Sequence, residues 1–85
     1  MNNIEIINTI RQFLIEEFEV EENKITPEAN LKITLGLDSL DYIDLVVVIE
    51  SNFQFKVKPE DFVNIITYQD FCNYVVSKVN VKELV

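Results

Sequence analysis

The segment from Asp38 to Phe53 constrains the fold most, because it predicts a long amphipathic helix with a well-marked start. Asp38 is a favourable N-cap residue, since its carboxylate can accept hydrogen bonds from the free N–H groups of the first helical turn. Asp41 stands at the position of the second member of a capping box, where Glu or Gln is more usual. Gly36, the only glycine of the chain, lies in the loop that precedes this start. We therefore expect a helix that begins at Ser39.

This predicted helix has one apolar face and one mixed face. At 100° per residue the apolar face consists of Tyr42, Leu45, Val46, Ile49 and Phe53, which suits a hydrophobic core. The opposite face consists of Leu40, Asp44, Val47 and Ser51, with Asp41 and Val48 beside them. No Lys or Arg occurs from Ile33 to Phe55. Exposed apolar residues among unbalanced carboxylates predict a docking surface for a basic partner.

Length and net charge restrict the class of protein and of partner. A chain of 85 residues is expected to form one domain, residues 1–85, with a small core. Its apolar content of 48% argues against disorder. The net charge of -8 makes nucleic acid and anionic membrane surfaces poor partners.

The residue inventory excludes several kinds of site. The single cysteine, Cys72, excludes an internal disulfide and fits a reducing compartment. Without histidine the chain can build neither a Cys/His zinc site nor a His-based triad, so no catalytic residue and no metal site are expected. The spacing of Asp38, Asp41 and Asp44 does not match a calcium-binding EF-hand loop either. No apolar run reaches the roughly 20 residues of a membrane span, and no signal peptide is recognised, so we expect a cytoplasmic protein without membrane insertion.

Two further long helices are expected, one before and one after the helix that begins at Ser39. Asn2 or Asn3 can cap a helix that ends near Phe18, with a buried face of Ile6, Ile10, Phe13 and Leu14 and with Ile7 at the margin. Thr67 can cap a last helix to about Val79, with residues 80–85 as a frayed tail. Its expected buried residues are Tyr68, Phe71, Cys72, Val75 and Val79. Cys72 is thus predicted to be a core residue rather than a nucleophile.

The connections differ in length. Residues 19 to 38 form a long first loop, in which Val20, Ile25, Leu31 and Leu35 are spaced to fix it to the bundle and Asn30 can cap a short turn. Five acids crowd the end of the first helix, and we interpret them as a solvated charged face, with a specific site for a basic partner as the alternative: Glu16, Glu17, Glu19, Glu21 and Glu22.

A short third helix is expected to begin at Pro59 and to end at Asn64 or Ile65. Phe62 and Ile65 are its predicted buried residues, whereas Val63 and Ile66 are expected to be exposed. The predicted fold is therefore all-α, a monomeric four-helix bundle with three longer helices, one short third helix and a long first loop.

Ser39 occupies the first position of the helix that follows Asp38. Its hydroxyl is expected to point outward at the positive end of the helix dipole, where an attached phosphate is favoured. On its own, however, a serine in this place belongs to a helix cap in most proteins.

The string Leu35-Gly36-Leu37-Asp38-Ser39-Leu40-Asp41 resembles the attachment motif of the acyl carrier proteins. The similarity continues through Asp44-Leu45-Val46, Ile49-Glu50 and Phe53 to Pro59-Glu60-Asp61 and on from Ile65 to Tyr74. It thus covers nearly the whole of a chain that has the length usual in this family.

This resemblance implies a function and a set of site residues. Ser39 would carry 4'-phosphopantetheine, derived from coenzyme A, through a phosphodiester, with Asp38 as the helix cap beside it. The implied partners are a phosphopantetheinyl transferase and acyl-processing enzymes with basic docking patches. Asp41, Asp44 and Glu50 would face these patches, and Leu40 and Val47 would be apolar anchors among them. The expected protein is a carrier of acyl thioesters and not an enzyme, foremost in fatty-acid biosynthesis.

Three departures from the family pattern leave the pathway open: Glu19 stands where a glycine is common, Ser51 replaces an acid, and Val47 replaces a frequent methionine. One alternative is a dedicated carrier for a polyketide, for D-alanine or for another specialised pathway. An alternative from a different class is an acidic helical interaction module without a prosthetic group. Leu37 disfavours a peptidyl carrier, in which two glycines more often precede the serine motif.

Overall fold

Three α-helices and two 3-10 helices make up the part of the chain that the computed structural model describes, which is residues 2–84 without the side chains of Pro59 and residues 81–84. In chain order they are α1 (Asn3–Phe18), η1 (Glu22–Lys24), α2 (Ser39–Phe53), η2 (Pro59–Asn64) and α3 (Tyr68–Leu84). No strand occurs in this part of the chain, where Asn30 and Thr67 form an isolated antiparallel bridge. The predicted all-α class is confirmed.

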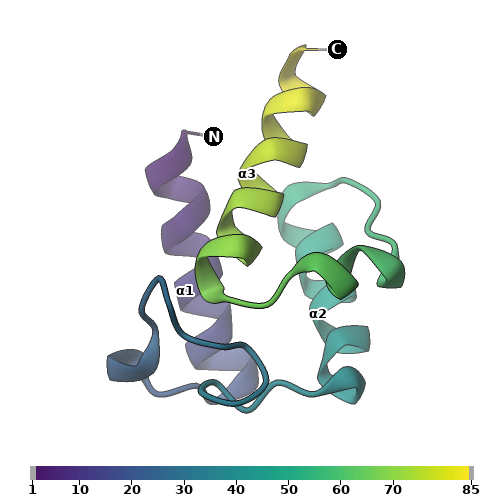
Figure 1. The fold of residues 1–85 in the computed structure, drawn as a ribbon. Coiled ribbons are helices and arrows are strands. Elements are labelled where there is room, and N and C mark those ends of the chain that lie inside the picture. Colours follow the sequence, from purple (N-terminus) through teal and green to yellow (C-terminus); the bar gives the residue numbers. More distant parts are fainter. Residues whose placement is uncertain (1, 85) are drawn as a thin grey trace.

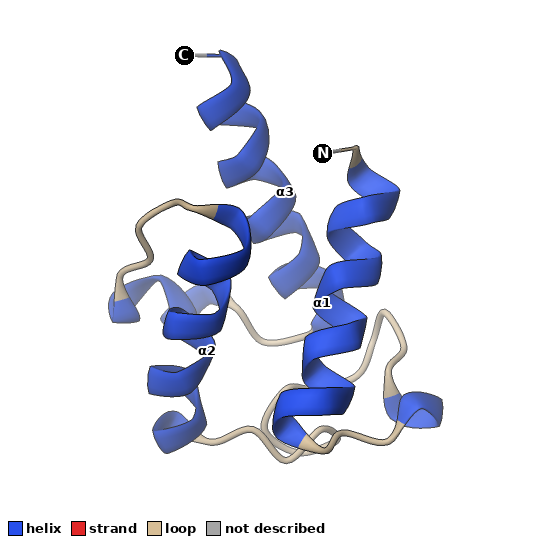
Figure 2. Cartoon of the chain, turned by 180° about the vertical axis from the view of Figure 1, so that it is seen from behind, coloured by secondary structure: helices blue, strands red, loops and turns tan. Residues whose placement is uncertain are grey.

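The helices place the start of α2 far from both ends of the described chain. In Figure 1, α1 runs downward, whereas α2 and α3 run upward. The start of α1 and the end of α3 therefore lie at one end of the bundle, and the start of α2 lies with the long first loop at the other. Figure 2 shows the same arrangement from behind.

Residues of all three α-helices form the core, as the spacing of their apolar side chains predicted. The residues expected to be buried in α1 (Ile6, Ile10, Phe13, Leu14) and in α3 (Tyr68, Phe71, Cys72, Val75, Val79) are all buried. In α2, Leu45, Ile49 and Phe53 are buried, while Tyr42 and Val46 are half-buried against the core. Phe71 lies at the centre of an aromatic cluster, because its ring centroid is 6.4 Å from that of Phe13 and 6.4 Å from that of Phe62.

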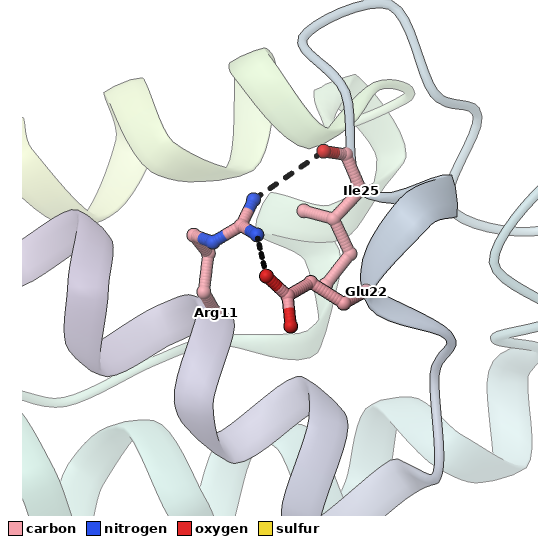
Figure 3. A network of polar contacts seen from close by, with 3 residues as sticks. All are labelled: Arg11, Glu22 and Ile25. Atoms are coloured by element: carbon pink, nitrogen blue, oxygen red, sulfur yellow. Dashed lines mark hydrogen bonds and ion pairs between the residues drawn. The ribbon is translucent and has the colours of Figure 1, made fainter.

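Buried side chains and one arginine fix the long first loop to the bundle. The four predicted anchors, Val20, Ile25, Leu31 and Leu35, are buried, and Ala29 and Leu37 are buried as well. Arg11 of α1 reaches this loop from the side, as Figure 3 shows. Its guanidinium donates to the Ile25 carbonyl at 3.4 Å and lies 3.3 Å from the Glu22 carboxylate. The ion pair is partly solvated and adds little stability, but the loop carbonyl gains a donor.

The first loop also supplies hydrogen-bond acceptors to the start of α3. The N–H groups of the first helical turn have no partner within a helix. Here the Tyr68 N–H donates to the Ala29 carbonyl at 2.8 Å, and the Gln69 N–H donates to the Pro27 carbonyl at 3.1 Å. The packed loop is thus part of the bundle rather than a free connection.

The N-cap predictions hold for α1 and α3. The Asn2 side chain accepts from the Glu5 N–H at 2.8 Å. At the start of α3 the Thr67 hydroxyl accepts from the Asp70 N–H at 3.1 Å, and the Asp70 carboxylate accepts from the Thr67 N–H at 3.2 Å. Reciprocal bonds of this kind define a capping box.

Two helix predictions need correction. The expected short third helix is the 3-10 helix η2, so the described chain contains three α-helices rather than four. Phe62 and Ile65 are three residues apart and both buried, and the three residues per turn of a 3-10 helix direct them to the same side. Val63 and Ile66 are exposed, as expected.

The second correction concerns α3, which continues past Val79 to Leu84 instead of ending there. The sequence from Tyr68 to Leu84 contains neither Gly nor Pro, so no residue in it interrupts the helical hydrogen bonds. Of the expected frayed tail, Val85 lies outside the described residues. The turn η1 was not predicted.

Candidate functional site

A complete capping box fixes the start of α2. The Asp38 carboxylate accepts from the Leu40 N–H at 2.9 Å and from the Asp41 N–H at 3.2 Å. In return, the Asp41 carboxylate accepts from the Asp38 N–H at 3.1 Å. The predicted cap is therefore confirmed, and Asp41 serves where Glu or Gln is usual. The carboxylates that begin this helix are directed toward backbone N–H groups.

Ser39 is the first helical residue and is exposed. It lies at the positive end of the α2 dipole, on the end of the bundle opposite to the start of α1. Its hydroxyl is thus available to a bulky partner that approaches from solvent, without displacing a core residue.

The loop before Ser39 is anchored on both sides of its glycine. Leu35 and Leu37 are buried, and the Leu37 N–H donates to the Leu31 carbonyl at 2.8 Å. Gly36 has φ +74°, a backbone conformation that L side chains rarely adopt, although a Cβ there would meet no atom within 4 Å. The glycine is therefore required by the turn and not by a lack of space. Ser39 is presented by a fixed segment rather than by a loose loop.

The outward face of α2 carries the residues expected there. Leu40 is 74% exposed, Val47 is 58% exposed, and Asp44 is exposed as well. Asp41 is half-buried, because its carboxylate belongs to the capping box. Ile43, which the helical pattern placed on neither face, is 65% exposed and completes an apolar strip with Leu40 and Val47. Its spacing of three residues from Leu40 and four from Val47 was the signal that could have identified it.

Glu50, like Asp41, uses its carboxylate in a hydrogen bond within the chain. It is half-buried, and its Oε2 accepts from the Val57 N–H at 3.0 Å. The carboxylate thereby holds the segment between α2 and η2 against the end of α2. A contact between Glu50 and a partner stays a prediction, and the structure adds this internal role.

Aromatic stacking joins the start of α2 to η2. The Tyr42 and Phe62 ring centroids are 4.7 Å apart with the planes 10° from parallel. Burial, followed by the negative charge of Asp38, raises the pKa of the Tyr42 hydroxyl above its usual value. Tyr42 therefore stays protonated at neutral pH, and its contribution here is packing rather than proton transfer.

The described residues provide neither a metal centre nor a membrane-spanning helix. No cluster of three or more His, Cys, Asp or Glu side chains there has an arrangement that could hold a metal ion. No helix in residues 2–84 has the length and apolar character of a membrane span.

A known protein family and a known protein match the segment that contains this site. A family described as "Phosphopantetheine attachment site" matches residues 8–75. An acyl carrier protein of Thermotoga maritima is 39% identical over 75 residues, which are 88% of this chain and 93% of the relative. Such an attachment domain implies a covalently bound 4'-phosphopantetheine, and its proteins are carriers rather than enzymes. A phosphopantetheinyl transferase and acyl-processing enzymes are the partners that follow. The two matches agree with the capped helix start and its exposed serine, and they show that the chain belongs to the acyl carrier protein family.

Proposed function

We propose that this protein holds acyl intermediates as thioesters on a 4'-phosphopantetheine arm attached to Ser39, in fatty-acid biosynthesis. The exposed position of Ser39 at the start of α2 is the observation that supports attachment of the arm at this residue. The motif around this serine lies within the matched family segment, residues 8–75.

The residues around Ser39 fit a phosphodiester. A negatively charged group is stabilised at a helix N-terminus by the dipole. The carboxylates of Asp38 and Asp41 accept backbone N–H groups, so part of their negative charge is compensated beside the serine. When bound, the arm supplies the thiol that forms the thioester. The chain itself contributes a fixed attachment point that stands clear of the core.

The outward face of α2 is the proposed docking surface, which we define as Leu40, Asp41, Ile43, Asp44 and Val47. Its apolar side chains can enter shallow pockets of a partner, and its carboxylates favour a partner with Lys and Arg around those pockets. Because no Lys or Arg occurs from Ile33 to Phe55, the chain itself does not neutralise this surface locally. Glu50 would add charge at its far end through the oxygen that does not accept from Val57.

Loading of the purified apo-protein tests the attachment. The protein is incubated with coenzyme A and a phosphopantetheinyl transferase, and its intact mass is measured. The Ser39 oxygen should displace the adenosine bisphosphate part of coenzyme A, so the mass rises by one phosphopantetheine. Ser39→Ala should stay unmodified, while Ser77→Ala, at an exposed serine of α3 outside the proposed docking surface, should load like the parent. An unchanged parent mass would instead support an interaction module without a prosthetic group.

A single charge reversal tests the docking surface. Asp44 is exposed and stands outside the capping box, so Asp44→Lys should leave the start of α2 intact. We expect loading of this variant to slow by about tenfold at low salt and by less at high salt, because salt screens exposed charges. Equal loading of variant and parent at every salt concentration would contradict the proposed surface.

The pathway is tested by the cargo. The protein is recovered from cells under conditions that preserve thioesters, and the acyl group is identified by mass. A series of straight saturated acyl chains supports fatty-acid biosynthesis. A polyketide intermediate or an aminoacyl group would assign the protein to a dedicated pathway.

A further inference from the structure

A surface groove between α1 and α2 lies next to the proposed docking surface. Its volume is about 380 Å³, and its lining includes Phe13, Glu16 and Glu17 of α1 together with Val47 and Ser51 of α2. Phe13 is buried below it, whereas Val47 is largely exposed at its edge. The groove therefore combines an apolar base with a polar rim, and Val47 connects it directly to the docking surface.

The rim of the groove is acidic. Glu16 and Glu17 are the charged side chains that line it, and both are exposed. They stand near the C-terminal end of α1, where the helix dipole adds to the negative potential. The only basic residue of α1, Arg11, is directed away toward the first loop, as Figure 3 shows. The Glu16 carboxylate accepts from the neutral Gln12 amide at 3.3 Å, so its charge is not compensated there.

We infer that this groove receives a basic amphipathic segment of the transferase that modifies Ser39, an inference that rests on the proposed function. An apolar side chain of that segment covers Val47 and Phe13, and its Lys or Arg side chains lie beside Glu16 and Glu17. The acidic rim thereby extends the footprint of the partner from α2 onto α1.

Proximity to Ser39 argues for the transferase as the occupant. Val47 stands eight residues after Ser39 in α2, which corresponds to about 12 Å along the helix axis. A protein interface of ordinary size covers about 800 Å² on each partner, a patch of roughly 30 Å across. An enzyme whose active site encloses the Ser39 hydroxyl thus reaches the groove. An enzyme that acts only at the distal end of a long flexible arm has no such constraint.

Neutralising the rim tests the inference by steady-state loading kinetics. For Glu16→Gln/Glu17→Gln we expect KM for the carrier to rise about fivefold at low salt, with kcat within about twofold of the parent. The matched control is Glu21→Gln/Glu28→Gln, which removes the same charge from two exposed acids outside the groove and should leave KM within about twofold. Removing acids from the end of α1 should not weaken the fold, since they oppose its dipole.

Filling the groove provides a second, charge-independent test. Ser51→Phe should also raise KM, because the ring occupies the space that the partner segment needs. Asn73→Phe adds the same bulk at an exposed position of α3, outside the groove, and should load like the parent.

The outcomes separate the two proposals. If KM is unchanged in both groove variants while the parent loads normally, the inference that the transferase binds in the groove is wrong, and the proposed function is unaffected. If the parent is not loaded, both the proposed function and the inferred binding of the transferase in the groove are wrong.

Discussion

Replacing Glu19 by glycine should stabilise the protein, because Glu19 has an unfavourable backbone conformation at the end of α1. Its φ of 56° and ψ of 32° lie in the left-handed region. The turn is held in this shape because the N–H groups of Glu19 and Val20 both donate to the Leu14 carbonyl, and because Val20 is buried. Glycine is the residue that most often ends a helix in this conformation.

The expected gain has a backbone part and a charge part. The left-handed region costs a residue with a Cβ about 1–2 kcal/mol, and the larger entropy of glycine in the unfolded chain offsets about 0.5–1 kcal/mol of that. Removing an acid from the C-terminal end of α1 adds about 0.3–1 kcal/mol at low salt. Taken at the middle of each range, the sum is about 1.4 kcal/mol, which for a domain of this size raises Tm by roughly 6–11 °C.

Thermal unfolding followed by far-UV circular dichroism measures this gain, with Glu19→Gln as the matched control. The Gln variant loses the charge but keeps the left-handed Cβ, so its gain should be small and should vanish at high salt. The gain of Glu19→Gly over Glu19→Gln should persist at every salt concentration. If the two variants have the same Tm throughout, the argument from backbone conformation is wrong.

Three further predictions concern the turn, the last helix and the thiol. Gly36→Ala should lower stability by about 1 kcal/mol in urea unfolding because of its positive φ, although the site is open, and an unchanged midpoint would contradict this. Hydrogen bonds from the Thr67 and Ile66 N–H groups lower the pKa of Asp70. The stabilising effect of the Asp70 carboxylate is therefore present above the ordinary carboxyl pKa and is lost as the pH falls through the lowered value. Asp70→Asn should be less stable than the parent near neutral pH, and the difference should shrink below about pH 4. A stability difference that does not depend on pH would refute the assignment. Burial raises the pKa of the Cys72 thiol, so a thiol reagent should react slowly in the folded state and faster in step with urea unfolding, whereas rapid native reaction would show that Cys72 is accessible.

The sequence alone determined the features that depend on neighbours within one or two helical turns. The capping box of Asp38 and Asp41 is one such feature, because a side chain three residues from a backbone N–H can bond to it wherever the helix lies. The apolar stripes of α1 and α3 are another, since a spacing of 3.6 residues directs them to one side in any fold. The start of α2 at Ser39 follows from these local rules.

Only the tertiary structure decided the features that join distant segments. The bond from the Val57 N–H to Glu50 depends on how the chain turns after α2, and the stacking of Tyr42 on Phe62 depends on where η2 packs. The same packing buries Phe62 and Ile65 together, and the segment forms a 3-10 helix where the sequence predicted only a short helix. The groove beside Val47 likewise exists because α1 and α2 lie next to each other. Spacing along the chain fixes which way a side chain points from its own helix, but what it meets there depends on the path of the rest of the chain.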